Sequence, residues 1–142
     1  MRKDSNGNII VAGEDTAVAI LEELNALNTN VEIKRQQPLV GLLTEEFKDS
    51  LAESYLKHKI DIMIIGLDKP VVVRVQGKDH EGILKSARDT VLKKILEWHN
   101  CTVVDLNWYD CPNLFKEKLN DDSREEVSNA LSSSGVQFWL PI

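Results

Sequence analysis

Three polar side chains occur at a spacing that suits divalent-metal chemistry. Asp61 is the charged residue of the apolar run 60–65, and Gln76 and Lys78 follow it fifteen and seventeen positions later, at the end of a second apolar run. An isolated carboxylate is too costly to bury, so Asp61 must be paired, hydrogen-bonded, metal-bound or located at the wet end of a strand. If the two runs pair, these side chains can reach one Mg²⁺ or Mn²⁺ ion, which prefers oxygen ligands. A strand-boundary aspartate and an ordinary strand exit explain the same residues without a metal.

The two apolar runs predict a β-hairpin with its turn at residues 66–70. A strand period of two puts the odd-numbered valines of 71–75 on one face, and Arg74 and Gln76 on the other. The second face therefore becomes polar toward one end. That end is where a site is expected.

The rest of the chain predicts helices and strands around this hairpin. The apolar residues of 83–99 follow helical spacing and those of 103–106 predict a buried strand, so a right-handed crossover should make that strand parallel to the second hairpin strand. The further expected elements are a helix from Asp15 to about residue 28, a strand over 31–35, a helix from Thr44 to about Lys57, and helices over 112–119 and 125–132.

At the hairpin, the chain resembles the PD-(D/E)XK, or restriction-endonuclease-like, nuclease superfamily. Asp61 matches the acid of that family's first motif strand, although Ile60 stands where the family often has proline. The residues 76–78, Gln-Gly-Lys, match the glutamine variant of the second motif. The resemblance implies an α/β fold whose core is a helix, a strand hairpin, a helix and a strand, with a mixed central sheet flanked by helices.

A second register resembles the branch that contains very-short-patch repair endonucleases and the RNA-binding RAP domains. That branch often has an acid-x-Asp-Gly-x-x-His pattern, and this chain keeps Gly77 and His80 but has Arg74 and Gln76 at the acidic positions. The resemblance covers roughly residues 44–119. An arginine there would repel a metal ion, and it would occupy the ion's place by pairing with Asp61.

The resemblance also implies roles for individual residues. Asp61, Gln76 and Glu53 would hold Mg²⁺ or Mn²⁺, Lys78 would orient the attacking water, and His80 would be an auxiliary acid or base. The residues that could contact nucleic acid are Arg74, Lys85, Arg88 and Trp108. Glu53 also fits an exposed helix position, and the two helix cations fit a solvated surface. Trp108, with Tyr109, fits the covered end of a core as well as a base-stacking site.

These residues support two classes of function. The first is a metal-dependent endonuclease that hydrolyses DNA phosphodiester bonds. The second is a catalytically inactive nuclease-fold module that binds nucleic acid, RNA included, or another protein. DNA is the more strongly expected nucleic-acid partner, and a homodimer or a larger complex is compatible with the sequence.

Composition sets further bounds. The 142 residues, 42% hydrophobic and 28% charged, predict one domain. Its expected parts are a nuclease-like core over 44–110, an N-terminal helix and strand over 1–43, and C-terminal helices and a tail over 111–142. No run is apolar enough to cross a membrane, so we expect a cytoplasmic protein with no membrane partner. The two cysteines, ten residues apart around a strand, should remain thiols.

Charge is unevenly distributed along the chain. The net charge is −6, which argues against indiscriminate coating of nucleic acid. Residues 70–100 nevertheless contain six basic and four acidic side chains, a local excess of two positive charges. The candidate site therefore lies in the most basic part of an acidic protein.

Overall fold

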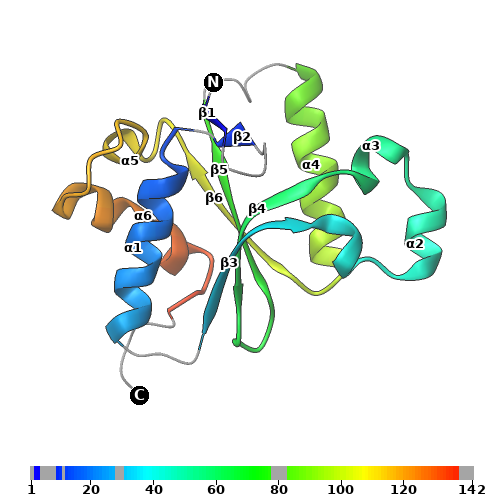
Figure 1. Cartoon of the computed structure of the whole chain (residues 1–142), viewed down its shortest axis with the longest axis horizontal. Coiled ribbons are helices and arrows are strands. Elements are labelled where there is room, and N and C mark those ends of the chain that lie inside the picture. The colour runs from blue at the N-terminus through cyan, green and yellow to red at the C-terminus, as the bar shows by residue number, and fades with distance from the viewer. Residues whose placement is uncertain (1, 4–8, 11, 28–30, 78–82, 138–142) are drawn as a thin grey trace.

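The computed structural model describes residues 2–3, 9–10, 12–27, 31–77 and 83–137. Within these residues the chain has an α/β fold with a four-stranded mixed sheet (Figure 1). The α/β class predicted from the sequence is therefore confirmed. No helix among the described residues is long and apolar enough to cross a membrane.

The sheet has the strand order β3-β4-β5-β6, and its strands are β3 (Glu32–Pro38), β4 (Lys59–Ile65), β5 (Val71–Gln76) and β6 (Thr102–Asn107). The first three strands form an antiparallel meander, while β5 and β6 are parallel. The predicted hairpin and the predicted parallel strand are both confirmed. The strand predicted for 31–35 runs three residues further, to Pro38.

Helices cover both faces of this sheet (Figure 1). One face packs against α1 (Glu14–Leu27), α5 (Pro112–Phe115) and α6 (Asp121–Ser133). The other packs against α4 (Ile83–Trp98), the crossover between β5 and β6. The remaining elements are the short sheet β1 (Arg2–Lys3) and β2 (Ile9–Ile10), the 3-10 helix η1 (Leu39–Leu42), α2 (Glu45–Ser50) and α3 (Glu53–Leu56).

Each face of the sheet has its own apolar core. The odd-numbered valines of β5 pack with α1 and α6, as the period of two predicted. Val72 packs instead with Leu92 and Leu96 of α4. Arg74 and Gln76 lie on the same side as Val72, so the α4 face of the sheet changes from apolar to polar along β5.

The helix predicted from Thr44 to Lys57 is two helices. Thr44 does cap the first, because its side chain accepts a hydrogen bond from the Phe47 N–H at 3.3 Å. Leu51 and Ala52 then adopt extended backbone angles, which end α2 and precede α3. The apolar residues of the segment still pack against the core on the α4 face of the sheet, but they do so from two short helices. These residues are Phe47, Leu51, Tyr55 and Leu56.

The core-facing stripe of α4 differs from the predicted one. Leu92, Ile95 and Leu96 are buried, whereas Val91 is 41% exposed and Trp98 is 75% exposed. Helical spacing in the sequence predicts instead that Val91, Ile95 and Trp98 share one apolar face with Leu84 and Ala87. Since apolar residues lie on two adjoining sides of this helix, spacing alone did not identify which side meets the sheet.

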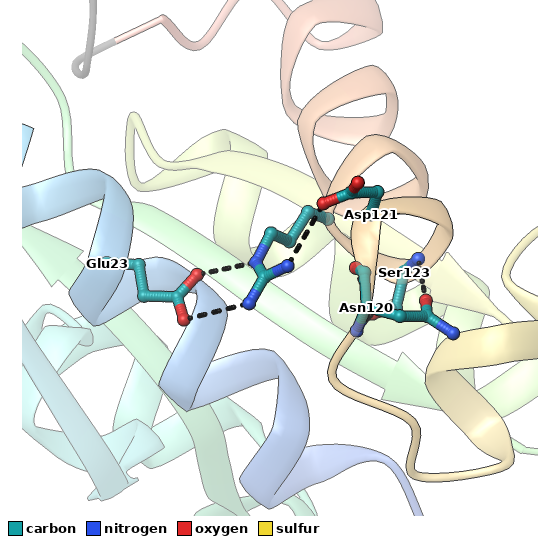
Figure 2. A network of polar contacts seen from close by, with 5 residues as sticks. Glu23, Asn120, Asp121 and Ser123 are labelled. Atoms are coloured by element: carbon teal, nitrogen blue, oxygen red, sulfur yellow. Dashed lines mark hydrogen bonds and ion pairs between the residues drawn. The ribbon is translucent and has the colours of Figure 1, made fainter.

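Hydrogen bonds by Asn120 and Ser123 start α6 (Figure 2). The Asn120 carbonyl Oδ1 accepts from the Ser123 N–H at 2.9 Å, and the Ser123 Oγ accepts from the Asn120 N–H at 3.0 Å. Arg124 then joins α6 to α1 through Glu23 at 2.9 Å, and it also reaches Asp121 at 3.2 Å. This reciprocal cap makes α6 begin four residues before the predicted start.

Glu126 caps a different helix from the one predicted. Its carboxylate accepts from the backbone N–H groups of Asn113 at 3.2 Å and Leu114 at 2.9 Å, at the start of α5. Ser123 with Glu126 three residues later predicts a capping box for α6, and this prediction is wrong because Glu126 bonds to α5 instead. Helix α5 is one turn, shorter than the predicted 112–119, and it is held by a carboxylate from α6.

Both cysteines are buried free thiols, in different cores. Burial, with the carboxylates of Glu126 and Asp110 nearby, raises the pKa of the Cys111 thiol to about 12. Cys111 is therefore protonated at neutral pH and is a poor nucleophile.

Candidate functional site

Strands β4 and β5, which carry Asp61 and Gln76, separate at the end where the sequence predicts the site. The β4–β5 ladder joins Ile62 to Val73, Met63 to Val72 and Ile64 to Val71. The register does not continue to Asp61 and Arg74. The strands therefore diverge at the polar end of the sheet.

The side-chain alternation of β4 changes phase at this point. Ile62 and Ile64 belong to the core beneath α1, whereas Ile60 and Met63 belong to the core beneath α4. Asp61 lies at the change. Opposite this position on β3, Gln36 has a φ of +52°, a conformation that an L-residue adopts at a cost.

Asp61 meets a carboxylate that the sequence did not single out. The Glu14 carboxyl group, at the first position of α1, lies within hydrogen-bonding reach of Asp61 and is 0% exposed. Burial raises the pKa of Glu14, and the nearby Arg35 opposes this shift. The helix predicted from Asp15 did not include Glu14, and nothing in the sequence indicated that α1 packs with Glu14 against Arg35 of β3.

Arg35 and Gln36 complete the surroundings of Glu14. Arg35 donates to Glu14 Oε2 and also pairs with Asp15 at 2.7 Å. Gln36 Nε2 approaches Glu14 Oε1 at 3.5 Å. The buried carboxylate is thus neutralised by an arginine from the edge strand.

Arg74 is held by three hydrogen bonds on the other face of the sheet. It donates to both carboxylate oxygens of Asp105, at 2.7 and 2.9 Å, and to the Asp89 carbonyl of α4 at 2.8 Å. Its side chain is 13% exposed. Asp105, its neighbour on β6, is thus a carboxylate partner of this cation, in addition to the predicted Asp61, whose pairing with Arg74 stays a prediction.

A small, mostly apolar cavity with a few polar side chains lies between β4 and β5. It has a volume of about 40 Å³, enough for one water molecule, and its polar lining is His58, Asp61, Arg74, Gln76 and Asp89. The structure therefore brings Asp61, Arg74 and Gln76 together around one cavity. Burial, with help from the positive charges of two arginines, lowers the pKa of His58.

A larger pocket of about 660 Å³ lies at the carboxyl ends of β5 and β6. Gln76 and Asn107 are register partners there, two residues beyond the Arg74–Asp105 pair and therefore on the same face. Crevices at the carboxyl ends of parallel strands are the usual ligand sites of α/β sheets. The lining residues are Arg74, Gln76, Gly77, Asp89, Thr90, Lys93, Asp105, Asn107, Trp108 and Tyr109.

Two aromatic rings form one wall of this pocket. Trp108 and Tyr109 meet edge to face with ring centroids 5.8 Å apart. Trp108 is half-buried, while Tyr109 is 65% exposed. The predicted stacking residue Trp108 thus lies at the pocket, and Tyr109 is the ring that is more accessible to a ligand.

The other predicted residues are placed differently. Lys78 and His80 lie outside the described residues, as does the side chain of Lys85. Glu53 is exposed on α3 and pairs with Lys57 at 3.1 Å. Arg88 lies 4.9 Å from the centre of the Tyr55 ring, a cation–π distance, so it also contributes to packing.

Metal ligands are sparse in the described part of the chain. Among those residues, no group of three or more histidine, cysteine, aspartate or glutamate side chains is placed to hold an ion. Of the predicted ligands, Asp61 meets the carboxylate of Glu14, and Arg35 already neutralises Glu14.

Comparisons with known proteins give no match: no family model fits the chain, and no curated protein or solved structure is significantly similar to it.

Proposed function

We propose that this protein is a nucleic-acid-binding module built on a restriction-endonuclease-like core, and that it binds a single strand without cutting it. The order of elements supports the proposal, since the hairpin of β4 and β5, the crossover helix α4 and the parallel strand β6 follow the order of that core, and α2 and α3 stand where its first helix is expected. Asp61 and Gln76 lie on its two motif strands.

The observation that carries the proposal is the composition of the 660 Å³ pocket. It places the carboxamides of Gln76 and Asn107 beside the accessible ring of Tyr109. Carboxamides hydrogen-bond the edges of bases, and aromatic rings stack on the faces of bases. Both base surfaces can be contacted only when the base is unpaired, so the ligand is a single strand or a loop.

Arg74 explains why binding would occur without cleavage. The resembled branch often has an acid at this position, and here a guanidinium occupies it and ties up the Asp105 carboxylate. The Arg74 side chain is 13% exposed and lies against Asp105. Its positive charge disfavours the binding of a metal cation at the same place. The site is thereby suited to holding a ligand rather than a metal ion.

Phosphate contacts in the described pocket are few. Lys93 lines it, and the three hydrogen bonds of Arg74 within the protein limit what that side chain can offer. Since each neutralised phosphate releases counterions, few contacts mean a shallow salt dependence. We expect modest affinity that rests on stacking more than on charge.

Fluorescence anisotropy with a labelled 15-nucleotide single strand of mixed sequence tests the proposal. Tyr109→Ala should weaken binding roughly tenfold, because stacking contributes about 1–3 kcal/mol per base. The matched control is Trp98→Ala, which removes a ring that is 75% exposed on α4, away from the pocket. Equal losses in the two variants, or no binding by the wild type, would contradict the proposal.

A metal-dependent endonuclease that hydrolyses DNA is the second candidate function. The contact between the carboxyl groups of Glu14 and Asp61, at the divergence of β4 and β5, favours it. These two residues, with Gln76, would hold Mg²⁺ or Mn²⁺, and the ion would polarise the scissile phosphate and activate a water molecule. Lys78 would orient that water, and His80 would assist proton transfer.

Cleavage assays separate the two candidates. Plasmid and branched DNA are incubated with the wild type and with Asp61→Asn in Mg²⁺ and in Mn²⁺. Cleavage by the wild type that disappears in the variant would establish the nuclease and overturn the binding-only proposal. Intact DNA in every reaction, together with the Tyr109-dependent binding described above, would support the binding module.

A further inference from the structure

We propose that the 660 Å³ pocket at the carboxyl ends of β5 and β6 selects an unpaired adenine or cytosine over thymine or uracil. This inference rests on the proposed function and names the ligand class of the same pocket. It follows from the balance of hydrogen-bond acceptors and donors along the pocket wall.

The amide of Asn107 is oriented by its own neighbour. Its Nδ2 donates to Asp110 Oδ2 at 3.5 Å, which leaves the Asn107 carbonyl Oδ1 to accept a hydrogen bond from a ligand. Gln76, its register partner on β5, adds a second carboxamide, whose carbonyl oxygen can accept in the same way. The pair therefore offers acceptors to an amino group.

A carboxylate adds to the acceptor side. Asp89 lines the pocket with the two amides, while both oxygens of Asp105 already accept from Arg74. Arg74, the cation among them, uses three of the five N–H donors of its guanidinium on Asp105 and on the Asp89 backbone. The Lys93 amine is a donor on a flexible stem that suits a phosphate better than a base edge.

The edges of bases differ in what they bring to such a wall. Adenine and cytosine present an amino group beside a ring nitrogen, and the amino group can donate to the Asn107 oxygen. Thymine and uracil present carbonyl oxygens at that position, which would face the oxygens of the wall. Stacking on Tyr109 does not depend on whether the base carries an amino group or a carbonyl oxygen, because every base has a π-face.

Anisotropy with labelled dC15, dA15 and dT15 tests the inference. The wild type should bind dC15 and dA15 about tenfold more tightly than dT15, as expected for one good polar base contact. Asn107→Leu should abolish this preference, whereas Asn107→Asp keeps acceptor oxygens and should retain it. Tyr109→Ala should weaken binding of all three by a similar factor.

The possible results separate this inference from the proposed function. Equal binding of the three oligonucleotides by the wild type, or tighter binding of dT15, would overturn the inference and leave the binding module standing. No binding of any oligonucleotide would overturn both. Circular dichroism checks the fold of each variant, and the comparison of bases on the wild type holds even if Asn107→Leu does not fold.

Discussion

Two arginine–carboxylate pairs lie on opposite faces of the sheet, and they differ in how exposed the carboxylate is to water. On the α1 face, Arg35 of β3 meets Glu14, which is 0% exposed. On the α4 face, Arg74 of β5 meets Asp105 of β6, and the two side chains are 13% and 23% exposed. The first pair joins a helix to an edge strand, and the second joins two strands at the mouth of a pocket.

The difference separates a structural role from a ligand-facing one. Glu14 cannot be hydrated in the folded state, so its charge depends on Arg35. Asp105 lies at a pocket wall and can be hydrated if its partner is removed. We therefore expect the α1-face pair to matter for stability and the α4-face pair to matter for the shape and charge of the pocket.

The largest expected effect is the loss of stability on removing Arg35. Arg35→Met leaves Glu14 buried without its cation and should lower the free energy of unfolding by about 2–3 kcal/mol, less than for a fully buried pair because Arg35 is 34% exposed. Urea denaturation measures it. The added change Glu14→Gln removes the stranded charge and should recover part of the loss. An Arg35→Met protein as stable as the wild type would contradict the structural role.

A smaller loss is expected on the α4 face. Arg74→Met leaves Asp105 able to take up water and should lower the free energy of unfolding by about 1–2 kcal/mol. The same urea experiment compares it directly with Arg35→Met. If Arg74→Met were the more damaging change, the assignment of the two roles would have to be reversed.

Much of the fold could be predicted from the sequence because its strongest patterns are local. The alternation of the valines in 71–75 and the short apolar runs on either side of α4 specified β4, β5 and β6 and their directions. The break at Leu51–Ala52 could not be predicted, since neither glycine nor proline marks it. The buried side of α4 could not be predicted either, because its apolar residues fit two sides of a helix.

The candidate site was less predictable because its contacts join distant segments. Asp61 and Gln76 were found by their spacing, and the structure places them around one cavity. Glu14 and Asn107 were missed, since only the packing of α1 on β3 brings Glu14 to Arg35, and only the strand register brings Asn107 to Gln76. Arg74 was singled out, but its pairing with Asp105 required the parallel register of β5 and β6.

The stability that depends on the α4 face should decrease in acid because of His58. Burial lowers the pKa of His58 below its ordinary value of 6.5, and Arg88 and Arg74 lower it further while Asp89 opposes them. Below pH 6.5 the unfolded chain therefore binds a proton at His58 that the folded protein binds less readily. The stability that neutral His58 contributes is complete above pH 6.5 and declines as the pH falls.

His58→Gln should make the stability curve flatter between pH 6.5 and 5. The difference in slope should not exceed about 1.4 kcal/mol per pH unit, the value for one proton. Urea midpoints at half-unit steps of pH measure it, and His99→Gln, at the end of α4, is the matched control. Parallel curves for the wild type and His58→Gln would show that His58 does not contribute.

The smallest effect is expected where an ion pair is open to solvent. Arg124 bridges Glu23 and Asp121 on the surface of α1 and α6 (Figure 2). Exposed pairs contribute little because water and salt screen them. Arg124→Gln should shift the urea midpoint far less than Arg35→Met does, and a comparable shift would mean that burial does not determine what these pairs contribute.

The most direct test of the central claim is a ¹H–¹⁵N NMR titration of the wild-type protein with unlabelled dC15. The binding proposal predicts that the side-chain amide signals of Gln76 and Asn107 and the backbone signals of Trp108 and Tyr109 shift together, while the side-chain signal of Trp98 stays in place. Shifts concentrated around Glu14 and Asp61, or an unchanged spectrum at saturating dC15, would contradict the claim that the carboxyl ends of β5 and β6 form the binding site.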